Sequence, residues 1–426
     1  MRLKREPSAF DVAVVGAGAA GQMAAIAAAE EGRRVILLEQ MDRPGLKVLA
    51  SGGGRCNLTN LAGRAAFVAA FGREGRFIGP ALDLLGPADL RLFMDRLGVP
   101  TAAPDGFHVY PASRRAADVQ AALGRRIGQL GVTLRVGCAV RGLWLDGGRL
   151  AGVETASAGR IAAGRVVLAC GGRSWPSLGG TGGGYALARQ AGHTIVEPVP
   201  ALVPLVVRER WPGRLAGVSL SGARVRIALA RQSKAGATGD VLFTHRGLSG
   251  PAVLDLSAEV ARLLARGKPV PLYVEPVPGV DESGWVNQLE AWRGARGRSG
   301  VANLLGERLP ASLARELCRM AGLEDGATAA HLAAGRRDAL AHMLGAIELA
   351  VTATEGFEAA FVTRGGVRLR EVDPATLAGR RLPGLYLAGE LLDLDGPSGG
   401  FNLQWAFASG RLAGKSAAAS APPHSP

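Results

Sequence analysis

Short apolar runs alternate with longer helical stretches over residues 10–190, a pattern typical of an α/β fold with a parallel sheet. Residues 11–15 form the first run and predict a buried strand. An Ala-rich stretch over residues 22–31 predicts the helix behind it, which ends at Gly32. Residues 35–38 predict a second buried strand. This order of strand, helix and strand is the opening unit of a doubly wound sheet.

The pattern changes twice further along the chain. Residues 165–172 and 384–390 each predict a buried strand that ends in a glycine turn, and we assign both to the first sheet. Between them, residues 194–276 show short Val/Leu/Arg alternations broken by Gly and Pro, which indicate an antiparallel sheet or small barrel. Residues 280–343 have apolar positions at helical spacing. Residues 347–354 predict a strand that returns to the β-rich region.

The predicted fold class is therefore α/β: a discontinuous Rossmann-like FAD-binding domain with an inserted β-rich domain and a small helical domain. The expected boundaries are 1–193 and 355–415 for the FAD-binding domain, 194–278 and 345–354 for the β-rich substrate domain, 279–344 for the helical domain, and 416–426 for a disordered tail.

Three glycines follow the first strand in a Gly-x-Gly-x-x-Gly arrangement that also includes Ala19 and Ala20. In this context Gly16 permits a tight turn, Gly18 lets the backbone approach a pyrophosphate, and Gly21 allows the helix to lie close to the strand. The turn therefore predicts a dinucleotide whose pyrophosphate lies at the helix N-terminus.

Glu39 follows the second strand, 18 residues after Gly21. A carboxylate at this position accepts hydrogen bonds from the ribose hydroxyls of an adenosine and disfavours a 2′-phosphate. The expected dinucleotide is thus FAD or NAD and not NADP.

Composition limits the remaining possibilities. The 426 residues are too many for one core, and 48% of them are hydrophobic. Four cysteines lie far apart with no Cys-x-x-Cys or metal-ligand spacing, so we expect no metal and a reducing compartment. The most apolar stretch, residues 12–29, already belongs to the nucleotide fold. We therefore expect a cytoplasmic protein without a membrane segment.

The formal net charge of +14 leaves two interpretations open. A polyanion such as RNA would be attracted by it. However, the basic residues are 45 arginines and only five lysines, as a GC-rich genome produces for any protein. Eleven basic and four acidic residues fall within 208–268, so the excess is concentrated in the β-rich region.

A second polar and glycine-rich stretch covers residues 45–60. Three consecutive glycines beside cationic and amide side chains let backbone N–H groups approach an anion or a flat ring. Cys56 is a candidate catalytic residue, but it has no partner cysteine nearby in the sequence, which disfavours dithiol chemistry.

The strand at 384–390 ends in Ala-Gly-Glu and resembles the second fingerprint of FAD proteins, in which Glu390 would meet the ribityl chain. Gly399 and Gly400 then open a helix whose amides would face the pyrimidine edge of a flavin, where negative charge develops on reduction. The complete set of expected cofactor contacts is Gly16, Gly18, Ala19, Ala20, Gly21, Glu39, Gln40, Lys47, Ser51, Gly52, Gly53, Arg55, Cys56, Asn57, Ala169, Gly171, Gly172, Gly389, Glu390, Asp395, Gly399, Gly400, Phe401, Asn402 and Gln404.

Four motifs together resemble those of the BaiN/RdsA-type FAD-dependent oxidoreductases, aminoacetone-oxidase-like bacterial flavoproteins: residues 45–60, 244–251, 362–367 and 384–410. The resemblance covers nearly the whole chain and implies FAD in a discontinuous domain with β-rich and helical insertions. Members have been associated with reduction of a uridine in large-subunit ribosomal RNA, oxidation of aminoacetone and bile-acid dehydroxylation. Leu46, Arg364 and the glycine-rich residues 179–184 depart from the family pattern.

Three functions remain as alternatives. The first is NAD(P)H-dependent reduction of a ribosomal RNA uridine, with NAD(P)H as a transient reductant and His245 as the candidate proton donor or acceptor. Trp175, Trp211 and Phe243 are the aromatics in or near the basic region that could stack on a base. The second is oxidation or dehydrogenation of a small amine or carbonyl compound in a closed pocket. The third is a flavin-bearing binding protein without turnover.

Overall fold

The computed structural model describes residues 10–230, 232–233 and 235–420, and the chain divides into two compact units. One unit runs to Val199 and resumes at Val362, and the other is Pro200–Phe361. These divisions lie a few residues from those expected at 193 and 355. The difference arises because β10 (Ile195–Ala201) pairs with β17 (Val362–Val367).

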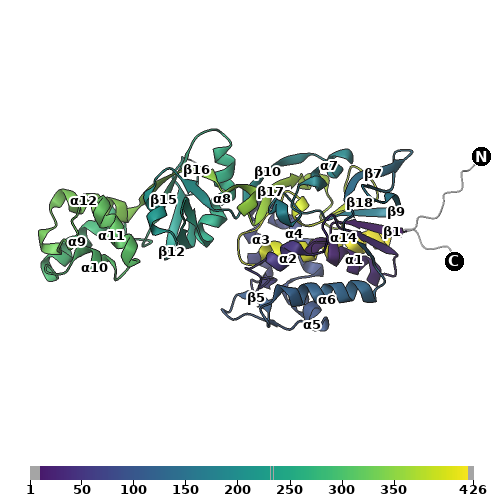
Figure 1. Cartoon of the computed structure of the whole chain (residues 1–426), viewed down its shortest axis with the longest axis horizontal. Coiled ribbons are helices and arrows are strands. Elements are labelled where there is room, and N and C mark those ends of the chain that lie inside the picture. Colours follow the sequence, from purple (N-terminus) through teal and green to yellow (C-terminus); the bar gives the residue numbers. More distant parts are fainter. Residues whose placement is uncertain (1–9, 231, 234, 421–426) are drawn as a thin grey trace, which may run out of the picture. The chain divides into compact units, whose positions relative to one another are not determined.

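A seven-stranded sheet forms the centre of the first unit, with strand order β6-β2-β1-β9-β8-β7 and β18 also paired with β9 (Figure 1). β1 pairs in parallel with β2 and with β9, β2 pairs in parallel with β6, and β9 pairs in parallel with β18. The strands are β1 (Phe10–Val15), β2 (Val35–Leu38), β6 (Thr133–Arg135), β7 (Val140–Asp146), β8 (Arg149–Thr155), β9 (Gly159–Leu168) and β18 (Leu385–Leu387).

The strand β9 pairs in two different ways along its length. Its first residues pair antiparallel with β8, whereas Ala163 to Leu168 pair parallel with β1 and Val166 to Leu168 also pair with β18. The expected assignment of the 165–172 and 384–390 runs to the first sheet is therefore confirmed.

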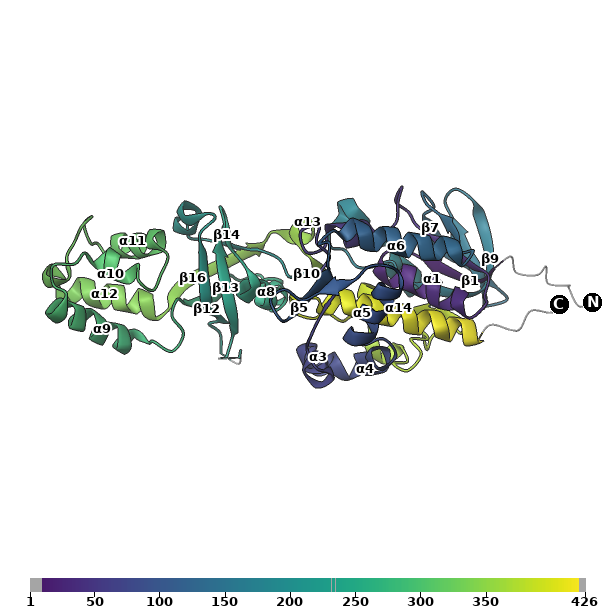
Figure 2. The same ribbon diagram turned by 90° about the horizontal axis from the view of Figure 1, so that it is seen from below.

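Two long helices from opposite ends of the chain lie side by side in both ribbon views, α1 (Ala19–Glu30) and α14 (Phe401–Ser420) (Figures 1 and 2). Their backbones are close enough to need glycine. A Cβ at Gly410 would lie 2.1 Å from the carbonyl oxygen of Ala20, and one at Gly414 would lie 2.2 Å from that of Ala24. Any larger residue at either position would push the helices apart.

The expected disordered tail is wrong for residues 416–420, which continue α14. Ala417 and Ala418 are fully buried against the main core, so apolar packing extends the helix where the sequence has no periodicity. Residues 421–426 lie outside the described residues.

The other elements of the first unit surround this framework. They are α2 (Leu46–Ala50), β3 (Thr59–Asn60), α3 (Arg64–Ala70), α4 (Gly75–Leu84), α5 (Pro87–Arg96), β4 (Thr101–Ala102), β5 (His108–Pro111), α6 (Ala116–Gln129) and α7 (Gly183–Gln190).

The second unit contains a closed barrel with strand order β11-β14-β13-β12-β15-β16. Its helix α8 (Pro251–Leu264) packs on the barrel, and the last strand is the returning segment expected at 347–354. The barrel strands are β11 (Leu205–Val207), β12 (Ser219–Ile227), β13 (Ala237–Phe243), β14 (Gly247–Ser249), β15 (Val270–Glu275) and β16 (Ile347–Thr354).

Helices replace strands between β15 and β16, as the sequence predicts. They are α9 (Glu282–Ala295), α10 (Val301–Leu305), α11 (Ala311–Met320) and α12 (Ala334–Gly345). Their buried apolar side chains form one continuous core with those of the barrel. The barrel and helices are therefore one compact unit and not two. None of the described helices has both the length and the apolar character needed to cross a bilayer.

Glu371 connects two segments of the first unit through buried polar contacts. Its carboxylate accepts hydrogen bonds from the Thr194 backbone N–H (2.8 Å) and hydroxyl (2.9 Å) and lies 3.2 Å from the Arg381 guanidinium. Burial raises the pKa of Glu371, but the Thr194 hydrogen bonds and Arg381 outweigh it and lower the pKa to about 2.

We predict that Glu371 stabilises the fold most above pH 4.5 and loses this effect as the pH falls towards 2, because its pKa is lower in the folded state. Glu371→Gln should cost about 1–3 kcal/mol at pH 7. Thermal unfolding across this pH range measures both. The exposed-pair variant Glu154→Gln is the control, and equal acid dependence of Glu371→Gln and the unmodified protein would contradict the prediction.

Candidate functional site: a dinucleotide cradle at the sheet edge

Four of the predicted cofactor residues lie where four parallel strands end. Gly16 follows β1, Glu39 follows β2, Ala169 follows β9, and Gly389 follows β18. Since these strands are parallel, their carboxyl ends share one edge of the sheet. Ligands of open α/β sheets bind outside this edge.

The glycine turn between β1 and α1 has the three conformational properties expected of it. Gly16 has φ +97°, which only glycine adopts freely. A Cβ at Gly21 would lie 1.7 Å from the Gly16 carbonyl oxygen, so this position cannot hold a side chain without a backbone shift. A Cβ at Gly18, by contrast, would meet nothing within 4 Å. The space beside Gly18 therefore fits the approach of a pyrophosphate to the N-terminus of α1, where Ala19 and Ala20 form the first turn.

The carboxylate of Glu39 is oriented by the turn itself. Its Oε2 accepts the Ala17 N–H at 2.7 Å, and its Oε1 accepts the Met41 N–H at 2.9 Å. Each oxygen keeps a lone pair for a ribose hydroxyl. Next to it, the Gln40 amide donates to the Gly179 carbonyl at 2.8 Å and thereby attaches the 179–184 loop to this region.

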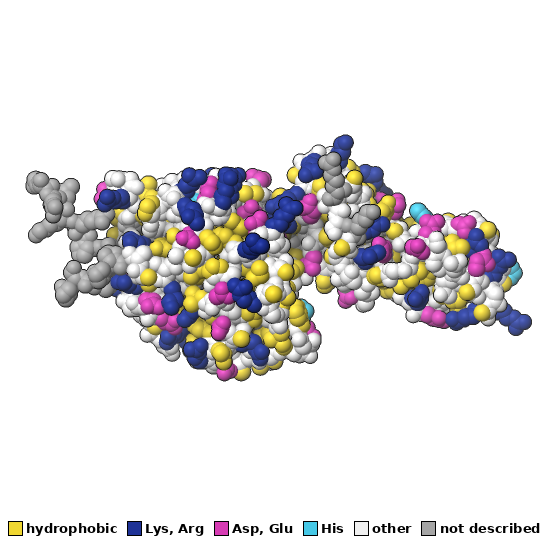
Figure 3. All heavy atoms as spheres, turned by 180° about the vertical axis from the view of Figure 1, so that it is seen from behind, with side chains coloured by type: hydrophobic (Ala, Val, Ile, Leu, Met, Phe, Trp, Pro, Cys, Tyr) yellow, Lys and Arg dark blue, Asp and Glu magenta, His cyan; other side chains and the backbone are white. Residues whose placement is uncertain are grey.

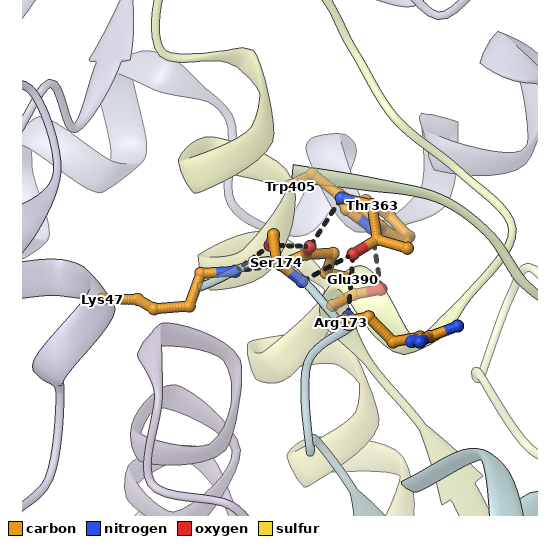
Figure 4. Close-up of polar contacts among 7 residues, drawn as sticks. Lys47, Arg173, Ser174, Thr363, Glu390 and Trp405 are labelled. Atoms are coloured by element: carbon orange, nitrogen blue, oxygen red, sulfur yellow. Dashed lines mark hydrogen bonds and ion pairs between the residues drawn. The ribbon is translucent and has the colours of Figure 1, made fainter. Parts of the chain in front are cut away.

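A network of charged and polar groups surrounds Glu390 (Figure 4). Lys47 extends from α2 and lies 2.7 Å from Oε2 of Glu390. Oε1 of Glu390 accepts from the Ser174 hydroxyl and from the Thr363 N–H, both at 2.7 Å. The Trp405 indole N–H donates to the carbonyl of Gly389 at 3.3 Å. The network thus joins α2, the loop after β9, β17 and α14.

Burial raises the pKa of Glu390, but Lys47 and the hydrogen bonds from Ser174 and Thr363 outweigh it and hold the pKa below the usual range. The carboxylate stays ionised, with a fifth of its side chain exposed. Oε2 accepts from Lys47 and keeps a lone pair that can accept another hydroxyl, which fits the ribityl contact expected of Glu390. Ser174 and Thr363 were not predicted. Thr363 lies within the 362–367 motif, and this motif was the signal in the sequence from which its role could have been predicted.

The 45–60 stretch folds into a short helix and a turn of left-handed glycines. Gly52 and Gly53 have φ +58° and +64°, and a Cβ at Gly53 would meet nothing within 4 Å. Ser51 caps α2 through a hydrogen bond to Val48, Arg55 stacks on the ring of Tyr110 at 5.5 Å, and Asn57 precedes β3.

The structure argues against a catalytic Cys56. Its side chain is completely buried, and burial raises the pKa of its thiol to about 12, against a smaller lowering by Ser51. A buried neutral thiol is a poor nucleophile. Within the described residues, no group of three His, Cys, Asp or Glu side chains is arranged to hold a metal ion.

The remaining predicted residues have structural contacts of their own. The amide of Asn402 bonds to both backbone groups of Gly396, and the amide of Gln404 is buried and donates to the Leu85 carbonyl at 2.6 Å. Phe401 packs on Phe67. Gly171 has φ +69° with open space beside it, and Gly172 adjoins Thr363 and Glu390. Gly399 and Gly400 precede α14, and Asp395 pairs with Arg364 at 3.3 Å.

His245 is in the other unit, on the exposed turn between β13 and β14. Trp211 and Phe243 are 7% and 1% exposed and pack on each other with ring centroids 5.8 Å apart. They are core residues of the barrel, so the expectation that they stack on a base is wrong.

Comparison with known proteins extends these findings. The chain matches the family model described as HI0933-like protein Rossmann domain over residues 10–416. It is 37% identical over 409 residues to a 3-dehydro-bile acid delta(4,6)-reductase of Clostridium scindens, covering 96% of this chain and 98% of the relative. It is 31% identical over 408 residues to a ribosomal RNA dihydrouridine synthase of Escherichia coli, covering 94% and 96% respectively.

Among solved structures, the 3-ketosteroid delta1-dehydrogenase of Sterolibacterium denitrificans aligns with a TM-score of 0.53 at 15% identity, covering 96% of this chain and 99% of that one. The fold, the glycine turn with Glu39 and Glu390 at the sheet edge, and the relatives together define an FAD-dependent oxidoreductase. Within that class, the chain belongs to the HI0933-like Rossmann family, which includes the BaiN and RdsA flavoproteins. The resemblance found in the sequence is confirmed.

We predict that Gly18→Ala and Gly21→Ala separate cofactor binding from folding. Gly18→Ala fits the folded chain and should change its unfolding free energy by less than about 0.5 kcal/mol. It should nevertheless weaken FAD binding about tenfold or more, because the methyl group occupies the pyrophosphate space. Gly21→Ala should destabilise the FAD-free protein by about 3 kcal/mol through the 1.7 Å clash. FAD titration and thermal melts of the FAD-free protein measure both effects, and equal melting temperatures of the two variants would refute the distinction.

A double-mutant cycle on Lys47→Met and Glu390→Gln should give a coupling energy of about 1–3 kcal/mol, because each single change leaves a partly buried group without its charged partner. The same cycle on the exposed pair of Arg160 and Glu154 should give about 0.5 kcal/mol or less. Denaturant unfolding of the FAD-free protein supplies both values. Equal coupling in the two pairs would show that the Glu390 network adds nothing beyond a surface ion pair.

Proposed function

We propose that this FAD-dependent oxidoreductase reduces a carbon–carbon double bond conjugated to a carbonyl, with NAD(P)H as the transient reductant and a uridine of large-subunit ribosomal RNA as the substrate. Two relatives that match nearly the whole chain are named for this reaction class. One is named a 3-dehydro-bile acid delta(4,6)-reductase and the other a ribosomal RNA dihydrouridine synthase. Reduction of a steroid enone and reduction of a uracil ring both saturate a carbon–carbon double bond conjugated to a carbonyl. Bound FAD supplies hydride transfer.

The preference for RNA rests on arginines of the barrel unit. Arg208, Arg210 and Arg246 are exposed, and none forms an ion pair with any residue that the structure describes. Their segments are adjacent, because the Val207 N–H donates to the Arg246 carbonyl and Gly213 lies against the backbone of His245. Cations without a partner are available to phosphates at no cost of breaking an ion pair.

The charge is local and does not cover the molecule. On the face in Figure 3, Lys and Arg side chains are interspersed with Asp and Glu over both units. Other arginines of the second unit form ion pairs: Arg224 and Arg226 share Glu275, and Arg296 pairs with Glu307. A small steroid-like enone is the second candidate substrate, because the relative at 37% identity is named for one.

We expect an anaerobic single turnover to decide between these substrates. The bound flavin is reduced and mixed with large-subunit ribosomal RNA lacking dihydrouridine, and flavin reoxidation and dihydrouridine are followed together. Matched formation of both is the expected result. A flavin that stays reduced with RNA but is reoxidised by a 3-oxo-4-ene steroid would establish the second candidate, and rapid reoxidation only by air would direct the search to oxidation of small amines.

RNA binding as a function of salt tests the arginines separately. Replacing Arg208, Arg210 and Arg246 with Ala should reduce the slope of log affinity against log salt by about two, because each phosphate contact contributes about 0.7–0.9. The control replaces the ion-paired Arg160, Arg296 and Arg319 with Ala and makes the same change in net charge. Equal slopes for the two triple variants would contradict a specific role of the barrel arginines.

A further inference from the structure

A histidine and an aspartate form a close pair beside the start of β5. Nδ1 of His108 lies 2.6 Å from Oδ2 of Asp105. The other carboxylate oxygen accepts the backbone N–H groups of Phe107 (3.0 Å) and His108 (2.8 Å). The hydrogen bond from the His108 ring lowers the pKa of Asp105 most, and the two backbone donors lower it further. Together they hold this pKa well below its usual range. Asp105 therefore stays ionised and fixes both the orientation of the ring and the proton on Nδ1.

The free nitrogen of this ring faces the N-terminus of α14. A Cβ at Gly399 would lie 3.2 Å from Nε2 of His108 and 3.8 Å from the ring of Phe107. Gly399 has φ +105°, and its carbonyl accepts the buried Asn60 amide at 2.8 Å. Asn60 is also the partner of His108 in the ladder between β3 and β5. The position of Nε2 relative to α14 is therefore fixed within one unit.

The chemistry at this point favours negative charge. α14 has 20 residues, and the N–H groups of its first turn carry the positive end of its dipole. An imidazole with a carboxylate at Nδ1 can present an N–H donor at Nε2 when it is protonated. About a third of the His108 side chain is exposed, so a ligand can reach it. The cations Arg55 and Arg114 are engaged elsewhere, because their guanidinium groups stack on the ring of Tyr110.

We propose that His108, positioned by Asp105, acts with the N-terminus of α14 on the pyrimidine edge of the bound flavin and stabilises its reduced, more negative state. The proposal rests on FAD binding and on the expected orientation of the flavin towards α14. It does not depend on which substrate is reduced, so its test uses no substrate.

The experiment measures the midpoint potential of the bound flavin at one fixed pH in the full-length protein. His108→Gln should make the potential more negative, so that the ratio of affinities for reduced over oxidised flavin falls about tenfold, as for loss of one hydrogen bond to a charged group. Asp105→Asn should shift it in the same direction by less. His108→Lys, which keeps a cation, should restore part of the shift.

The control is a second histidine–carboxylate pair of similar geometry. Nδ1 of His342 lies 2.8 Å from Glu282 in the helical part of the second unit, and His342→Gln should leave the potential unchanged. The NMR signals of the His108 ring should also shift when FAD is added to the FAD-free protein.

Three results would overturn the proposal. The potential of His108→Gln could equal that of the unmodified protein. The His108 ring signals could be insensitive to FAD. Finally, His108→Gln and His108→Lys could lower the potential and the melting temperature of the FAD-free protein equally, which would make the pair structural. A failed turnover with RNA or steroid would leave all three measurements unaffected.

Discussion

The close approach of α14 to α1 is the contact on which the architecture of the first unit depends. It brings the last described helix of the chain against the helix that follows the first strand, at separations that only Gly410 and Gly414 permit. β18, which precedes α14 in the chain, pairs with β9, so Glu390 lies at the edge where Gly16 and Glu39 already lie. Dispersion contacts over a long Ala- and Gly-rich interface thus assemble a site from segments separated by the entire second unit.

The Glu390 network shows how this packed edge becomes polar without leaving a charge uncompensated. Lys47 supplies the countercharge, and Ser174 and Thr363 supply neutral donors, each from a different element. A partly buried carboxylate is tolerated because its oxygens are satisfied. The network also joins β17 to the cradle, so the segment that returns from the second unit is attached directly to the cofactor site.

Local pattern was sufficient for most of the fold and for the adenosine half of the site. The turn after β1 and the acid after β2 depend on contacts within 39 residues of the N-terminus, so spacing predicts them. Accessibility was harder to predict. Cys56, Trp211 and Phe243 are functional residue types in suggestive positions, yet all three are buried. Burial depends on partners that are distant in the sequence, which periodicity cannot identify.

The sequence by itself determined the strand and helix order, the barrel region, the glycine turn and the family, because these follow from local periodicity and from the conformational freedom of glycine. Only the tertiary structure decided that residues 416–420 are helical, that Ser174 and Thr363 serve Glu390, and that His108 faces Gly399. Each of these depends on contact between segments up to hundreds of residues apart, and such contacts are set by the packing of the whole unit.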